Sequence, residues 1–120
     1  MLYALINNTG IHRLEVSEKL ELADLQNRVG IEGEPAFIEY VRNQFPDPVI
    51  DLICDEEFLY KELPLTCITR RSIALCGQVI AAACTDDGET IGLTEAQFQL
   101  VATNLIRASA LQSIMPQVGA

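Results

Sequence analysis

The stretch IALCGQVIAAACTDDGETIGLT, residues 73–94, decides the fold because it joins a long apolar run to a turn signal. Residues 74–84 are apolar on both faces of the alternating pattern, apart from Gln78. This pattern predicts one long strand at the centre of a sheet, covered on both sides. Asp87 and Gly88 follow the run, and these residue types tolerate the positive φ angles of a type I′ turn. We therefore predict a hairpin in which TIGL returns along the strand.

The cysteines and acids of this stretch do not fit a metal site or a disulfide. Aligning Gly88 with the glycine of an EF-hand calcium loop places Ala83 and Thr94 where oxygen ligands are required. Cys76 and Cys84 would lie about 26 Å apart along one strand, and a disulfide needs α-carbons within about 7 Å. No C-x-x-C motif is present. We expect four free thiols that pack as small apolar side chains: Cys54, Cys67, Cys76 and Cys84.

Strand patterns also dominate the chain outside this stretch, and they predict four more strands: residues 2–7, 11–16, 36–42 and 49–55. The first two flank the turn NNTG and predict an N-terminal hairpin. The passage that begins at Pro64 and runs to Ser72 has no regular pattern, so we expect it to be irregular.

Two segments have the periodicity of helices. Leucine and valine recur at helical spacing before Gly30, which predicts a short helix near residues 20–30. Thr94 and Gln97 form a capping box, which predicts a C-terminal helix near residues 94–113. The pattern as a whole predicts an α+β fold with a mainly antiparallel sheet.

The length of 120 residues is sufficient for one hydrophobic core. We therefore predict a single domain over residues 1–114, followed by a flexible tail at residues 115–120.

The predicted C-terminal helix has apolar residues on two sides. One stripe should pack on the sheet, and it contains Phe98, Val101, Ala102, Leu105 and Ala108. The opposite side carries Leu100, Arg107, Leu111 and Ile114. Either a loop covers this second stripe or the helix end is poorly ordered, or the stripe is a self-association surface that makes the protein a homo-oligomer, most simply a dimer.

Charge and hydropathy limit the partners of the chain. Seventeen acidic residues against eight basic ones give a net charge of −9, which disfavours direct binding to nucleic acid. The acidity is compatible with simple solubility, and also with an inhibitor that mimics the phosphates of DNA. No uncharged run has the roughly 20 apolar residues of a membrane span, and no signal peptide pattern begins the sequence. We expect a cytoplasmic protein.

Few residues indicate chemistry. His12 is the single histidine, which excludes multi-histidine metal sites and favours a structural or surface role. The acids DEE at residues 55–57 are expected to be solvated on a turn. Arg70 and Arg71 could bind an anion through their guanidinium groups, or could offset nearby acids. The sequence therefore predicts no catalytic residues, no metal site and no cofactor.

The order of several short motifs resembles a family known as domain of unknown function 3846. The resembling segments are DLQNRVG (24–30), FIEYV (37–41), LICDEEFL (52–59), LP (63–64), LCGQVIAA (75–82) and DDGETIGLT (86–94). The family has a second glycine where this chain has Ile31, and an asparagine where it has Thr66 or Cys67. The resemblance covers about residues 20–95, outside the N-terminal hairpin and the C-terminal helix. It implies a small α+β domain and no particular activity.

Three functions are compatible with these patterns. The leading hypothesis is a non-enzymatic binding or protein-interaction module that self-associates, because an absence of catalytic motifs accompanies the doubled apolar stripe. The first alternative is the acidic DNA mimic. The second alternative is a small enzyme that uses Arg70, Arg71 and nearby acids. Fold analogy does not choose among them.

Overall fold

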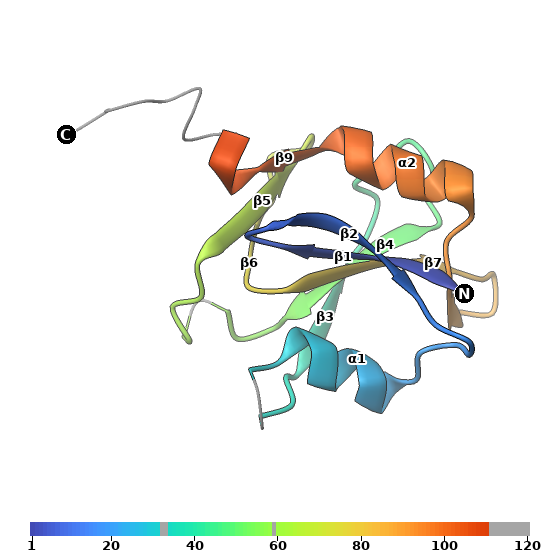
Figure 1. The fold of residues 1–120 in the computed structure, drawn as a ribbon, viewed down its shortest axis with the longest axis horizontal. Coiled ribbons are helices and arrows are strands. Elements are labelled where there is room, and N and C mark those ends of the chain that lie inside the picture. The colour runs from blue at the N-terminus through green and yellow to red at the C-terminus, as the bar shows by residue number, and fades with distance from the viewer. Residues whose placement is uncertain (32–33, 59, 111–120) are drawn as a thin grey trace.

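The computed structural model describes residues 1–31, 34–58 and 60–110. These residues form an α+β fold of antiparallel strands with a helix on each side of the larger sheet (Figure 1). The strands are β1 (Leu2–Asn7), β2 (Gly10–Glu15), β3 (Ile38–Val41), β4 (Ile50–Asp55), β5 (Leu65–Thr69), β6 (Ala74–Cys76), β7 (Val79–Cys84), β8 (Thr90–Ile91) and β9 (Leu105–Arg107). The helices are α1 (Leu22–Val29) and α2 (Glu95–Asn104). The predicted fold class is confirmed.

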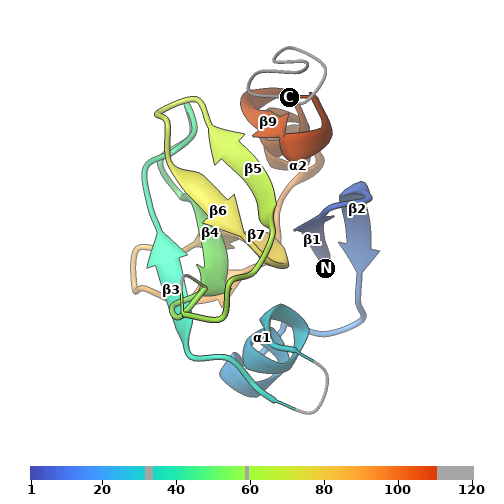
Figure 2. The same ribbon diagram turned by 90° about the vertical axis from the view of Figure 1, so that its left-hand side faces the viewer.

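The larger sheet has the strand order β2-β1-β7-β4-β3, and the short strand β8 pairs with β7. A smaller sheet has the order β6-β5-β9. The predicted hairpin is confirmed, since β1 and β2 pair in register up to Asn7 and Gly10. In Figure 2 the smaller sheet lies beside α2, whereas α1 lies on the far side of the larger sheet.

The prediction of one long strand over residues 74–84 is wrong. The chain bends at Gly77, where φ is +74°, and divides the run between two sheets. The part before the bend, β6, pairs with β5. The part after it, β7, pairs with β1 and β4. The expectation of an irregular passage is wrong as well, because β5 is a strand within residues 64–72.

The strand β7 is covered on both sides, as predicted for the centre of the sheet. Val79, Ala81 and Ala83 face one core, which α2 closes with Phe98 and Val101. On the opposite face, Ile80 and Ala82 belong to a second core, which α1 closes with two side chains, Leu25 and Val29. Burial on both faces explains why β7 is apolar without alternation.

The hairpin after β7 is confirmed, but its turn is not of type I′. Only Gly88 has a positive φ, +83°, whereas a type I′ turn requires it at both central residues. The amide of Gly88 donates to the Thr85 carbonyl at 2.9 Å, and the Thr85 amide donates to the Glu89 carbonyl at 2.8 Å. The loop therefore has three residues and ends in a left-handed glycine, which is the common three-residue hairpin geometry.

The capping box of α2 is confirmed, but the helix is shorter than predicted. The hydroxyl of Thr94 accepts from the Gln97 amide at 3.1 Å, and Gln97 Oε1 accepts from the Thr94 amide at 2.8 Å. At the other end, Asn104 Nδ2 donates to the Leu100 carbonyl at 2.8 Å and satisfies a carbonyl of the last turn. The chain then becomes the strand β9, which pairs with β5.

The prediction of a helix to residue 113 is therefore wrong for residues 105–107. Pairing with β5 replaces helical hydrogen bonds there, which is a tertiary effect that helical periodicity does not report. The domain boundary at residue 114 and the tail at residues 115–120 lie outside the described residues and stay predictions.

The prediction that the acids DEE at residues 55–57 are all solvated is wrong for Asp55. The side chain of Asp55 is 1% exposed. Its Oδ2 accepts from Lys61 Nζ at 2.7 Å, and its Oδ1 accepts from the Glu57 amide at 2.7 Å. The buried carboxylate thereby holds the loop that leads from β4 towards β5.

A second buried carboxyl, that of Asp51, has weaker compensation. Its nearest cation is Arg42, whose Nη1 lies 3.9 Å from Asp51 Oδ2. Burial raises the pKa of Asp51, and Arg42 opposes this shift only in part. Because the pKa in the folded state is above that in the unfolded state, the fold favours the protonated carboxyl. The stability that the protonated Asp51 carboxyl contributes is therefore lost as pH rises through the raised pKa.

We predict that Asp51→Asn raises the melting temperature at pH 7, because it removes a buried charge. The gain should shrink as pH falls below the ordinary aspartate pKa of about 3.9, where Asp51 is protonated in both states. Thermal unfolding followed by circular dichroism at several pH values measures this effect, with Asp86→Asn as an exposed control. A lower melting temperature at pH 7, or a difference independent of pH, would contradict the prediction.

Candidate binding site

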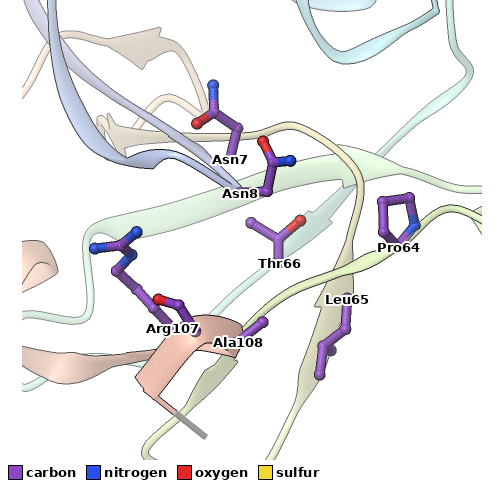
Figure 3. Close-up of a pocket in the computed structure, with 8 residues that line it drawn as sticks. Asn7, Asn8, Pro64, Leu65, Thr66, Arg107 and Ala108 are labelled. Atoms are coloured by element: carbon purple, nitrogen blue, oxygen red, sulfur yellow. The ribbon is translucent and has the colours of Figure 1, made fainter. Parts of the chain in front are cut away.

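A hollow lies where the two sheets part, at the bend between β6 and β7. The end of β1 reaches this bend from one sheet, and the start of β5 reaches it from the other. We call the space between them the fork hollow. It comprises two adjoining cavities of about 240 and 250 Å³, and Figure 3 shows residues that line the first. The lining residues are Asn7, Asn8, Pro64, Leu65, Thr66, Gly77, Gln78, Arg107, Ala108 and Ser109.

Hydrogen bonds at the bend fix one wall of the fork hollow. The amide of Gly77 donates to the Pro64 carbonyl at 2.9 Å. The hydroxyl of Thr66, which is buried, donates to the Gly77 carbonyl. The side chain of Gln78 donates to the Arg28 carbonyl on the α1 side of the sheet. The polar groups of the bend are thus engaged within the protein, and they set the shape of the wall.

The turn between β1 and β2 forms the opposite wall. Asn7 Oδ1 accepts from the Thr9 amide at 3.0 Å and from the Thr9 hydroxyl at 2.7 Å. His12 Nε2 lies 3.2 Å from the same oxygen and 2.7 Å from the Thr9 hydroxyl. The exposed His12 therefore belongs to the turn, in agreement with the expected structural or surface role. These contacts hold Asn7 and leave its neighbour Asn8 at the mouth of the hollow.

Two polar side chains at the fork hollow have no bond to the described residues: the amide of Asn8 and the guanidinium of Arg107. Figure 3 shows Arg107 rising from β9 on one side of the pocket, and Asn8 above Thr66 with its amide pointing away from both Thr66 and Arg107. Arg107 reaches this place because β9 pairs with β5, where Arg107 lies opposite Cys67. The hollow therefore presents two side chains with unused hydrogen-bond donors, as far as the described residues go, while the polar groups of its walls are bonded within the protein.

Among the described residues, the lining of the fork hollow contains no carboxylate, although the chain carries 17 acidic residues. Four of the other basic residues are paired with acids, whereas Arg28, Arg70 and Arg71 have no carboxylate partner among the described residues. Arg13 Nη1 lies 2.6 Å from Glu95 Oε1, and Lys61 is bonded to Asp55. Lys19 contacts Glu89 in the same way. Arg107 has no such partner among the described residues, so its charge is uncompensated by a neighbouring carboxylate.

The predicted anion site at Arg70 and Arg71 lies elsewhere. Both side chains are exposed in the turn between β5 and β6, and neither lines the fork hollow. Arg70 Nη2 donates to the Thr103 carbonyl at 3.1 Å, near the end of α2. This contact ties the turn to the helix and occupies one donor of Arg70.

The four residues predicted for self-association do not lie on one helical face. Leu100 is half-buried in α2 and packs against the core. Arg107 belongs to β9 and lines the fork hollow. Leu111 and Ile114 lie outside the described residues. The surface as such is untested.

All four cysteines are free, as expected, and they lie in two environments. Cys54 and Cys67 are fully buried, whereas Cys76 and Cys84 are half-buried. Burial raises the pKa of Cys54 to about 12 and that of Cys67 to about 11. These two thiols are therefore protonated at neutral pH and behave as core side chains. No group of three metal-ligating side chains occurs among the described residues.

Sequence reasoning missed most of the fork hollow. The sequence predicts Asn7 and Asn8 only as part of a turn, and Thr66 falls in the passage predicted to be irregular. The one usable signal was Gly77 beside Gln78 within an apolar run, because a glycine in a strand often marks a bend or a close approach.

The chain was compared with known families, curated proteins and solved structures. It matches the family described as domain of unknown function (DUF3846) over residues 4–106. The chain belongs to the DUF3846 family. No curated protein and no solved structure matches it.

The DUF3846 match is longer than the resemblance, which had left out the N-terminal hairpin and the C-terminal helix. The family match takes in the hairpin from residue 4 onward, the whole of α2 and the first two residues of β9, and Arg107 lies one residue beyond it. Thr66 and Cys67 are the two positions at which the resemblance noted an asparagine in the family. In this chain the Thr66 hydroxyl bonds to the Gly77 carbonyl, and Cys67 is buried. Within the described residues, no helix is long and apolar enough to cross a membrane.

Proposed function

We propose that this DUF3846 domain is a non-catalytic binding module and that its ligand occupies the fork hollow. The observation that carries the proposal is a pair of donors without a hydrogen bond to the described residues, the side chains of Asn8 and Arg107, in a concave site whose other polar side chains are bonded. Ligand sites are typically concave and largely preformed, with a few polar groups that orient the ligand. The fork hollow has this construction.

The chemistry of the lining favours binding over proton transfer. Its polar side chains are amides, hydroxyls and one guanidinium. Groups of these kinds suit hydrogen bonding to a ligand. General acid–base catalysis requires a group whose pKa is near the working pH.

We predict that Asn8→Phe blocks binding by filling the mouth of the fork hollow. Asn8 is exposed in a turn, so this substitution should leave the core intact. A panel of small polar compounds is screened by thermal shift against the wild type and the variant. At least one compound should stabilise the wild type and fail to stabilise Asn8→Phe.

Asn27→Phe is the matched control, because Asn27 is also exposed but lies on α1, away from the hollow lining. It should respond like the wild type. A compound that stabilises all three proteins equally binds elsewhere. A panel without any stabilising compound, or one whose compounds all act elsewhere, would contradict the proposal.

Self-association is a second proposal, supported by the position of β9. This strand lies at the edge of the smaller sheet among the described residues. An edge strand presents unpaired backbone donors and acceptors that a second copy can use. The chain segment that carries Leu111 and Ile114 follows β9 directly.

We predict that multi-angle light scattering gives the mass of a dimer for the wild type, compared with 13.2 kDa for one chain. The double variant Leu111→Glu/Ile114→Glu should be monomeric, since charges disfavour a buried apolar contact. Leu100 is left unchanged because it packs against the core, so its substitution would also reduce stability. A monomeric wild type over a wide concentration range would contradict self-association.

The remaining expectations stay predictions: the DNA mimic, the enzyme that uses Arg70 and Arg71, and the cytoplasmic location. Some acids serve within the fold. Asp51 and Asp55 are buried, and Glu89 and Glu95 form ion pairs, so these four are not free to imitate phosphates.

A further inference from the structure

The fork hollow is positively charged at its free donor, within a protein of net charge −9. Arg107 is half-buried, and its guanidinium has no carboxylate partner among the described residues. A buried or half-buried cation is stabilised when an anion approaches it. A bound anion would therefore offset a positive charge that no carboxylate among the described residues offsets.

The neighbourhood of Arg107 adds further groups that can donate to an anion. The side-chain amide of Asn8, which has no hydrogen bond to the described residues, belongs to the turn near Arg107. The ring of His12 and the guanidinium of Arg107 both lie within 4 Å of the place where a β-carbon on Gly10 would be. Arg107 therefore lies close to this turn, whose side chains can add donors to an anion that Arg107 binds.

From this arrangement we infer that the ligand of the fork hollow carries an oxyanion, either a carboxylate or a phosphate, which Arg107 binds. This inference rests on the proposed function and names the chemical class of the ligand. The planar guanidinium matches the paired oxygens of both groups. Cavities of about 240 and 250 Å³ suit a small molecule that bears such a group.

The test uses three probes that separate charge from shape: inorganic phosphate, acetate and acetamide. Acetamide has nearly the shape of acetate but no charge. Each probe is titrated at constant ionic strength into ¹⁵N-labelled wild type, and the amide signals of Asn8, Thr66 and Gly77 are followed. Phosphate or acetate should give saturable shifts at these residues, and acetamide should not.

Three variants test whether the positive charge of Arg107 binds the anion. Arg107→Gln should weaken binding by about ten-fold or more, because it removes a charged hydrogen-bonding group. Arg107→Lys keeps the charge but loses the planar pair of donors, so it should retain part of the affinity. Arg71→Gln removes the same charge from an exposed position outside the hollow, and it should bind like the wild type. The spectrum of each variant also reports whether it is folded.

Every outcome decides the inference. Tighter binding of phosphate than acetate identifies a phosphate ligand, and the reverse order identifies a carboxylate. If acetamide shifts the hollow signals as strongly as acetate, the anion inference fails while the hollow remains a binding site. If none of the three probes shifts them, or if Arg71→Gln loses binding and Arg107→Gln does not, the anion inference is overturned. The compound panel with Asn8→Phe then judges the proposed function separately.

Discussion

The bend at Gly77 is the constraint on which the rest of the structure depends. It allows one apolar run to be the central strand of the larger sheet and an edge strand of the smaller one. The positive φ of +74° at Gly77 redirects the backbone, and a β-carbon there would come within 2.7 Å of Leu63 Cδ1. The positive φ favours glycine at this position, and the side chain of Leu63 would have to shift to admit a β-carbon. The freed backbone groups are satisfied by Pro64 and Thr66, which ties the start of β5 to the bend.

The candidate site follows from the same bend. Strands β1 and β5 lie along successive parts of one bent run, so their ends meet at the bend without pairing with each other. The space between these ends is the fork hollow. Pairing of β9 with β5 then brings Arg107 to it, from a part of the chain about 30 residues further on. A site assembled in this way combines rigid walls with free donors, which is the arrangement that favours a preorganised ligand site.

Short sequence patterns predicted the features that depend on interactions between residues close together in the chain. The N-terminal hairpin, the capping box at Thr94 and the coverage of β7 on both faces all followed from patterns within a few residues. The division of the run 74–84 and the strand β9 did not, because each depends on pairing with β5. That strand was itself missed, since its residues Leu65–Thr69 show no clean alternation between buried and exposed positions. The candidate site was missed for the same reason: its residues meet only after the two sheets have formed.

The most direct test compares Gly77→Ala with Gly88→Ala in thermal unfolding and in amide spectra. Both glycines have positive φ, so both variants carry a similar backbone strain of about 1–2 kcal/mol. A β-carbon at Gly88 would meet no atom within 4 Å, whereas one at Gly77 would press on Leu63. The account predicts a larger loss of melting temperature for Gly77→Ala, with amide shifts that reach both Asn7 and Thr66. Equal losses, with shifts confined to residues next to Gly77, would contradict the central role of the bend.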